Sequence, residues 1–135
     1  MLICVGRRRS VAAMSTDLRQ QLGHQGERLA AEHFQRLGYE VLARRYRTRF
    51  GELDLIVADR RCLVFCEVKT RRAGSGAPWD ALTPAKQAQV RRMAAAWLVE
   101  AKARPHADEL RFDAVGVVVD AQGRLVSLDH LEAAF

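Results

Sequence analysis

Cysteine is scarce in this chain, and long apolar runs are missing. Cys62 and Cys66, two of only three cysteines, stand four residues apart, which on one strand separates them by roughly 13 Å. That separation excludes a disulfide and a shared zinc ion, so we expect buried thiols in a reducing compartment, the cytoplasm. Every apolar run is far shorter than the ~18–20 residues of a membrane-spanning helix, and we expect no membrane partner.

Acidic residues are in the minority. The chain has 16 Asp and Glu against 22 Lys and Arg, a net charge of +6, and the isoelectric point is near 9.9. A surface of this sign attracts polyanions, most simply nucleic acid. A solvated basic surface with no polyanionic partner is the alternative interpretation of the same charge.

Internal repeats, low-complexity tracts and interdomain linkers are also absent from the sequence. Residues 1–16 carry the Arg7–Arg9 run and are predicted to form a disordered basic arm, with Met14 as an alternative start. Residues 17–135 are long enough for one globular domain and are predicted to form one.

Hydrophobic periodicity predicts the secondary structure of this domain. Its predicted order is helix, three strands, helix, two strands: an α/β fold in which helices cover a mixed sheet. The expected elements are a helix over 17–37 ended by Gly38, strands over 39–46, 52–57 and 62–69, a basic loop over 70–82 with Trp79 as a candidate ligand contact, a helix from Pro84 capped by Thr83, strands over 110–119 and 125–128, and a helical turn over 129–135.

The second and third predicted strands carry charge where buried strands carry Val or Ile. Glu52 and Asp54 are two apart, as are Glu67 and Lys69, and side chains two apart share a face of a strand. Carboxylates among apolar neighbours lose hydration and need a cation or a hydrogen-bond network. The opposite faces are predicted to be apolar core: Leu53, Leu55 and Val57 on one strand, and Cys62, Val64, Cys66 and Val68 on the other.

The register of this hairpin decides whether the carboxylates meet. A four-residue loop at 59–62 makes paired positions sum to 121 and sets Asp54 opposite Glu67, with Cβ atoms about 4.5–5.5 Å apart. A three-residue loop without a bulge would put the two carboxylates on opposite faces. The metal-site hypothesis below therefore depends on the first register.

Asp54, Glu67 and the main-chain carbonyl of Val68 are hard oxygen donors, which suit Mg²⁺ or Mn²⁺. Lys69 beside them can orient an attacking water or neutralise charge on a pentavalent phosphorus. Glu27, close to the apolar stripe of the first helix, could point toward the sheet, and a solvent-facing helical acid is the alternative. These roles fit phosphodiester hydrolysis, whereas the alternative is a buried ion pair of Lys69 with no catalytic purpose.

The same residues carry a family resemblance. Asp54, a gap of twelve residues and Glu67-Val68-Lys69 resemble the signature of the PD-(D/E)XK nuclease superfamily, although Leu53 stands where that signature has proline. The segments GERLA at 26–30, GELDLI at 51–56 and FCEVKTR at 65–71 resemble the YraN-type family of uncharacterised bacterial proteins. That family is similar to archaeal Holliday-junction resolvases.

The resemblance implies a restriction-endonuclease-like core and a Mg²⁺- or Mn²⁺-dependent DNA endonuclease, with branched DNA as a candidate substrate. Glu27, Asp54, Glu67 and Lys69 are then the expected catalytic residues, and Asp54, Glu67 and Val68 the expected metal ligands. Expected contacts of nucleic acid, DNA rather than RNA, are Arg71, Arg72, Lys86 and Arg91. Because junction cleavage needs two symmetric cuts, a homodimer is a natural expectation. The alternatives are a non-catalytic nucleic-acid-binding module and an adaptor in a DNA-processing complex.

Overall fold

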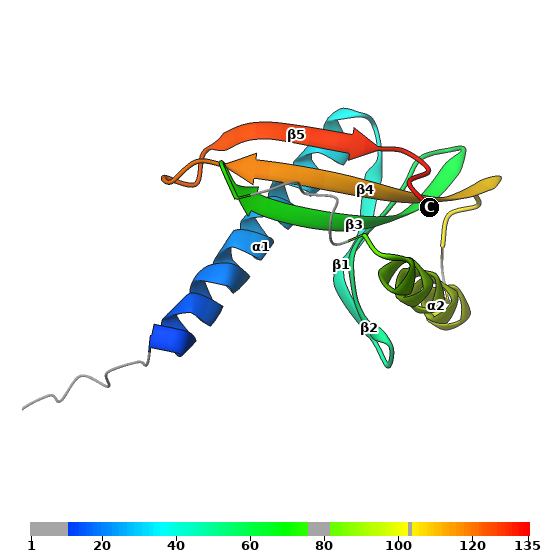
Figure 1. Cartoon of the computed structure of the whole chain (residues 1–135). Coiled ribbons are helices and arrows are strands. Elements are labelled where there is room, and N and C mark those ends of the chain that lie inside the picture. The colour runs from blue at the N-terminus through cyan, green and yellow to red at the C-terminus, as the bar shows by residue number, and fades with distance from the viewer. Residues whose placement is uncertain (1–10, 76–81, 103) are drawn as a thin grey trace, which may run out of the picture.

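Two helices pack on a five-stranded mixed sheet in the computed structural model, which describes residues 11–75, 82–102 and 104–135 (Figure 1). The elements are α1 (Val11–Arg36), β1 (Glu40–Thr48), β2 (Gly51–Ala58), β3 (Cys62–Arg72), α2 (Pro84–Glu100), β4 (Glu109–Val119) and β5 (Leu125–Leu131). The strands lie in the order β1-β2-β3-β4-β5, and only β3 and β4 are parallel. The predicted mixed α/β fold and the predicted order of its elements are therefore confirmed.

Helix α1 differs from its prediction at the N-terminal end. It begins at Val11, so residues 11–16 are helical and their assignment to a disordered arm is wrong. Residues 1–10 lie outside the described part of the chain. The helix runs on through Gly23 and Gly26 to Arg36, and Gly38, with φ of 94°, ends it as predicted. Among the described residues, no helix is long and apolar enough to cross a membrane.

Two strands, β3 and β5, extend well past their predicted C-terminal ends because each pairs with β4 there. β3 continues through Arg72, which pairs with Val119 of β4, so the first residues of the predicted loop 70–82 are strand. Trp79 lies outside the described residues. β5 runs to Leu131 and pairs with β4, and the predicted helical turn over 129–135 is wrong. Backbone pairing with a neighbouring strand outweighs local preference in both places.

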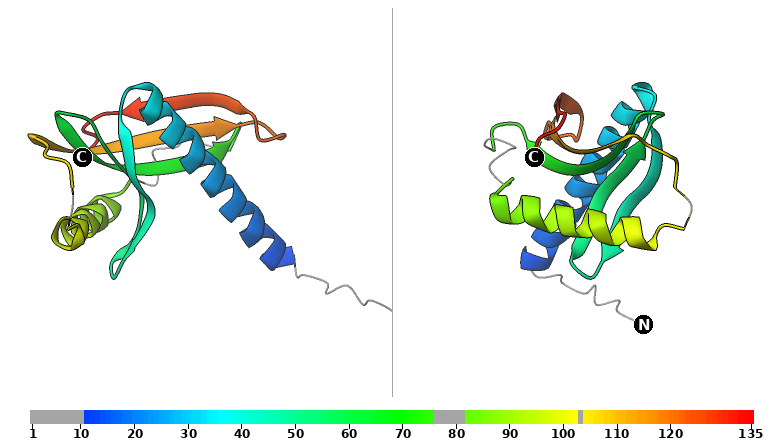
Figure 2. Two further views of the ribbon diagram at one scale, coloured as in Figure 1. Left: turned by 180° about the vertical axis from the view of Figure 1, so that it is seen from behind. Right: turned by 90° about the vertical axis from the view of Figure 1, so that its right-hand side faces the viewer.

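The core has one layer on each side of the sheet. Figure 2 shows α1 crossing one face and α2 lying at the opposite side. The layer under α1 consists of Ala30, Ala31, Phe34, Leu55, Val57, Cys62, Val64, Cys66, Val115, Val117 and Val119. The layer under α2 consists of Leu53, Ile56, Ala58, Leu63, Phe65, Val90, Met93, Ala94 and Trp97. Both described cysteines are buried free thiols, as predicted.

Leu53 is the one predicted core residue that changes sides, because it packs under α2 and not with Leu55. The neighbouring strand β1 is irregular here: its register shifts between Val41 and Ala43, and Arg45 has φ of 48°. Such irregularities bend a strand and increase its twist. The end of the sheet at which β1 connects to β2 consequently turns toward α2 (Figure 2).

Gly26 brings α1 close to β3. A Cβ atom at Gly26 would lie 1.7 Å from Thr70 Oγ1 and 2.8 Å from Thr70 Cβ, whereas one at Gly23 would meet nothing within 4 Å. Only the absent side chain of glycine therefore permits this contact between helix and sheet.

Gly26→Ala is expected to destabilise the protein by about 1–3 kcal/mol, because overpacking outweighs the better helix propensity of alanine. Gly23→Ala is the matched control in the same helix and should stabilise the protein by up to about 1 kcal/mol. Urea unfolding of both variants measures the two effects. Equal stability of the two variants would contradict the close contact.

A buried polar network joins α1 to β4 and β5. Asp113 is fully buried and receives two hydrogen bonds of 2.7 Å from Arg111, one of 2.7 Å from His130 Nε2 and one of 3.1 Å from the Ala133 N–H. His130 Nδ1 lies 3.0 Å from His33 Nε2. Because His130 donates to Asp113 through Nε2, its Nδ1 is left to accept the N–H of a neutral His33.

These contacts displace two pKa values. Burial acts to raise the pKa of Asp113, but the hydrogen bonds from His130, Arg111 and the Ala133 N–H outweigh it and hold that pKa below 3.8. Burial, followed by the proximity of His130 and Arg36, lowers the pKa of His33 below 6.5. In both cases the folded protein binds a proton less readily than the unfolded chain.

The free energy of unfolding is therefore expected to fall as pH drops below 6.5, the ordinary pKa of His33, and to fall again below 3.8 as Asp113 takes up a proton. In His33→Gln, an amide N–H of glutamine replaces the imidazole N–H as the donor to His130, and the new side chain does not titrate. This variant should lose less stability than the wild type between about pH 7.5 and about pH 5.5. Urea unfolding at the two pH values measures the difference, and parallel losses would contradict the role of His33.

Candidate functional site

The hairpin of β2 and β3 has the register that the site requires. Its paired residues run from Ala58↔Leu63 to Leu55↔Cys66, and every pair sums to 121, as predicted. The turn lacks glycine and asparagine, but Asp59 Oδ1 accepts the backbone N–H groups of Arg61 at 2.9 Å and Cys62 at 2.8 Å. An aspartate that bonds the backbone ahead of it in this way stabilises a tight turn.

Pairing of β2 with β3 stops after Leu55↔Cys66, and a carboxylate takes the place of the next backbone bond. Asp54 Oδ2 accepts the backbone N–H of Val68 at 2.8 Å. The N–H and C=O groups of one strand residue point to the same side, so the Val68 carbonyl faces this side of β3 as well. The separation of the strands thus exposes one carboxylate and one carbonyl to the same space.

Glu67 contributes the second carboxylate. Its Oε1 lies 3.2 Å from Lys86 Nζ, and its Oε2 is buried without a hydrogen-bond partner. Lys86 stands in the first turn of α2, where Thr83 caps the helix by accepting the Lys86 N–H at 3.2 Å. A buried carboxylate oxygen with no partner is uncommon and costly, which marks this atom as a candidate ligand.

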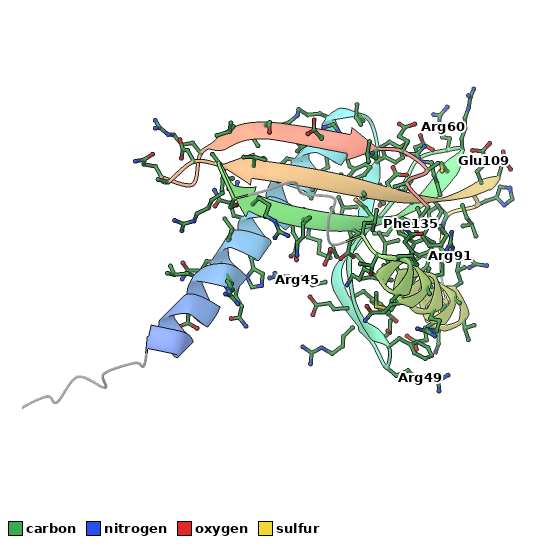
Figure 3. The ribbon with its side chains drawn as sticks, in the orientation of Figure 1. Arg45, Arg49, Arg60, Arg91, Glu109 and Phe135 are labelled. Atoms are coloured by element: carbon green, nitrogen blue, oxygen red, sulfur yellow. The ribbon has the colours of Figure 1, made fainter. Side chains whose placement is uncertain are left out.

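Glu27 approaches the same place from α1. Its side chain is 16 % exposed, and its Oε2 lies 3.6 Å from Nε of Arg45 on β1. Figure 3 shows Arg45 between α1 and the hairpin. The positive φ of Arg45, 48°, costs about 1–3 kcal/mol for a residue with a side chain and is typical of functional sites. The low exposure of Glu27 and its contact with Arg45 confirm that Glu27 points inward.

The carboxylates crowd one another. Burial raises the pKa of Asp54 well above its ordinary value, and Glu67 and then Glu27 add to the rise, against the opposing hydrogen bond from the Val68 N–H. Burial also raises the pKa of Glu27. The positive charge of Arg45 acts to lower that pKa, whereas the negative charges of Glu52 and Glu67 act to raise it. A cation placed among these groups would relieve their repulsion.

In the part of the chain that the structure describes, Lys69 does not form the buried ion pair that was the alternative to a catalytic role. It is half-buried, and within the described residues no carboxylate lies within ion-pair distance of its ammonium group. Lys69 lines an open groove of about 490 Å³ together with Arg71 and Arg72 of β3 and Arg19 of α1. The lysine in contact with Glu67 is Lys86.

Arg91, which was predicted to contact nucleic acid, packs against two aromatic rings. The guanidinium group of Arg91 stands 5.7 Å and 5.6 Å from the ring centroids of Phe112 and Phe135, and Figure 3 shows Arg91 and Phe135 near each other. Glu52 lies 4.0 Å from Arg47 and close enough to Glu27 to contribute to the rise of the pKa of Glu27. Arg19 and Arg45 were missed by sequence reasoning, and the only signal for Arg45 was a pair of arginines within a predicted strand.

The donor set is small. Among the side chains that the structure describes, no group of three or more His, Cys, Asp and Glu is arranged to hold a metal ion. Asp54, Glu67 and the Val68 carbonyl are therefore the candidate ligands, and water would have to complete the shell. Mg²⁺ commonly binds in this way, through one or two carboxylates and several retained waters.

Comparison with known proteins places these residues in a family. Residues 26–117, which include Glu27, Asp54, Glu67, Lys69 and Lys86, match the model of Uncharacterised protein family UPF0102. The chain belongs to this family. A UPF0102 protein of Frankia casuarinae is 48 % identical over 84 % of this chain and 95 % of its own length. UPF0102 proteins of Acidothermus cellulolyticus (45 %, covering 78 % and 87 %) and Nocardia farcinica (44 %, covering 87 % and 91 %) are similar.

Asp54→Asn is expected to stabilise the metal-free UPF0102 protein at neutral pH by about 0.5–2 kcal/mol. Because the pKa of Asp54 is raised, the folded state favours the neutral carboxyl, and its stability declines as pH rises through that pKa. Asparagine removes the repulsion and can still accept the Val68 N–H. Urea unfolding in EDTA measures the gain.

The same variant tests cation binding. Mn²⁺ should raise the melting temperature of the wild type by mass action and leave that of Asp54→Asn unchanged. Glu109→Gln is the matched control, because it removes the same charge from an exposed position at the far end of β4 (Figure 3). A less stable Asp54→Asn protein in EDTA, or an equal Mn²⁺ response in all three proteins, would contradict the electrostatic argument.

Proposed function

We propose that this protein is a Mg²⁺- or Mn²⁺-dependent endonuclease that hydrolyses phosphodiester bonds of DNA. The observation that carries the proposal is the buried Glu67 Oε2, which has no hydrogen-bond partner and belongs to a carboxylate crowded against Asp54. The order of the elements and the position of Asp54, Glu67 and Lys69 on β2 and β3 support membership of the PD-(D/E)XK superfamily. Two buried free thiols fit action in a reducing cytoplasm.

The residues at the site fit a divalent cation with hard oxygen ligands. Asp54, Glu67 and the Val68 carbonyl would hold it, and the unpartnered Glu67 oxygen and the raised pKa of Asp54 both indicate a missing positive charge. When bound, such an ion polarises a phosphoryl oxygen and lowers the pKa of water. Neither His nor Cys is among these donors, which favours Mg²⁺ or Mn²⁺ over zinc.

The chain's own side chains would then act on the phosphate and on the attacking water. Lys69 has no carboxylate partner among the described residues and stands two positions from Glu67 on β3, so its ammonium group can stabilise negative charge that develops on phosphorus-bound oxygens. Lys86 holds Glu67 in place through its 3.2 Å contact. Glu27, oriented by Arg45, can accept a hydrogen bond from water.

A non-catalytic nucleic-acid-binding module, on its own or as an adaptor in a DNA-processing complex, is the second candidate. One observation favours it: Lys86 already places a positive charge 3.2 Å from Glu67, so part of the need for a cation is met within the chain. A binder of this kind would bind DNA in a salt-sensitive way and would be indifferent to divalent metal. Cleavage of branched DNA would in addition require the two symmetric cuts of a homodimer.

Lys69→Ala and Glu67→Gln are expected to reduce Mn²⁺-dependent cleavage by about 10²–10³-fold or more, the usual effect of removing one preorganised electrostatic group. Both should leave the fold unchanged, and Glu67→Gln should also leave the binding of DNA in EDTA nearly unchanged, whereas Lys69→Ala can lose no more than one phosphate contact. The substrates are linear, flapped and four-way-junction DNAs. Lys102→Ala, which removes one exposed charge beyond the end of α2, is the control.

Full activity of both variants would refute the nuclease proposal. Absence of cleavage by the wild type on every substrate, with intact binding that ignores Mn²⁺, would favour the binding module instead.

A further inference from the structure

A basic groove leads away from the carboxylates on the α1 side. It lies between the first half of α1 and the end of β3, where α1 extends past the sheet (Figure 1). The groove measures about 490 Å³, and its charged lining residues are Arg19, Lys69, Arg71 and Arg72. All four are cations, and none of them has an ion-pair partner among the described residues. Four unpaired positive charges around one groove form a site for an anion.

The backbone of β3 adds hydrogen-bond donors to this groove. β3 loses β2 as a partner after Cys66 but stays paired with β4 as far as Arg72. The Ala73 N–H bonds to Val119 of β4, and the Val68 N–H points away from β4 to Asp54. By this alternation the Thr70 N–H also faces away from β4, along the open edge. Backbone N–H groups of this kind commonly bind phosphate oxygens.

The size and lining of the groove limit what it can hold. A volume of about 490 Å³ is that of a small-ligand pocket, which is enough for a short stretch of the backbone of one strand. No aromatic side chain is among the described residues that line it, so those residues offer bases no stacking platform. Contacts through Arg and Lys to phosphates are independent of sequence.

We propose that this groove binds the phosphodiester backbone of a single nucleic-acid strand next to the bond that the site cleaves. The inference rests on the proposed function and adds a substrate class: DNA that carries a single-stranded segment, such as a flap, overhang or open branch, beside the cleaved bond. Lys69 belongs to both regions, because it lines the groove and lies two residues from Glu67. A strand held by Arg19, Arg71 and Arg72 is thereby led toward the carboxylates.

The test compares two triple variants that carry the same change in charge. Arg19→Ala, Arg71→Ala and Arg72→Ala together empty the groove of its arginines. Arg36→Ala, Arg60→Ala and Arg61→Ala form the control. Arg36 is an exposed arginine at the C-terminal end of α1, and Arg60 and Arg61 are exposed arginines in the turn between β2 and β3 (Arg60 is labelled in Figure 3). Circular dichroism and thermal melting establish that both triples fold like the wild type.

Binding is measured in EDTA by fluorescence anisotropy over a series of salt concentrations, with a labelled oligothymidylate and a labelled blunt duplex as probes. Each phosphate contact to a single strand contributes about 0.7 to the slope of log K against log salt, so the groove triple should lose about 2 from that slope. The control triple should keep the wild-type slope. On the blunt duplex, the two triples should behave alike.

Equal slopes for both triples on the oligothymidylate, or no binding of it by the wild type, would overturn the inference. A larger effect of the groove triple on the blunt duplex would assign the groove to duplex DNA and would overturn it as well.

Cleavage assays with Mn²⁺ separate this inference from the proposed function. If the wild type cleaves flapped DNA in preference to a blunt duplex, and the groove triple loses that preference, both stand. If the wild type cleaves and the groove triple cleaves with the wild-type preference, the nuclease proposal stands and the groove inference fails. If the wild type cleaves nothing while only the groove triple loses its salt slope, the nuclease proposal fails and the groove remains a strand-binding site.

Discussion

The site depends on the point at which β2 leaves β3. After Leu55↔Cys66 the ladder ends, and Asp54 accepts the Val68 N–H that a backbone carbonyl would otherwise take. This exchange satisfies the amide, but it buries a carboxylate beside Glu67, and burial of charge is costly. The surrounding elements reduce this cost, since α2 brings Lys86 to Glu67 and β1 brings Arg45 to Glu27.

Two acids in this chain, Asp113 and Asp54, show how the surroundings of a carboxylate separate a structural role from a chemical one. Asp113 receives hydrogen bonds from Arg111, His130 and a backbone N–H, and its pKa is lowered. Asp54 has one backbone donor and a neighbouring carboxylate, and its pKa is raised. The first acid is fully paired and holds β4 to β5 and α1. The second is left in need of a cation, which is the arrangement expected of a functional site.

The groove and the carboxylates follow from the same departure of the strands. Because β3 continues to Arg72 after β2 has left it, its free edge faces the first half of α1, and Gly26 allows the helix to pack against Thr70 at that point. The family match over residues 26–117 includes the carboxylates, Lys69, Arg71 and Arg72, while Arg19 lies before it. Lys69 stands where the groove reaches the site.

The sequence by itself determined the order of the elements, the register of the hairpin and the meeting of Asp54 with Glu67. Alternation along a strand and the length of one turn are local properties, and an odd sum of paired positions follows from them. Only the tertiary structure decided that Lys86 contacts Glu67, that Arg45 pairs with Glu27, that Leu53 packs under α2 and that Arg19 joins the groove. These contacts join residues far apart in the chain, and they depend on strand twist, helix docking and the pairing of β3 with β4, which no local pattern encodes.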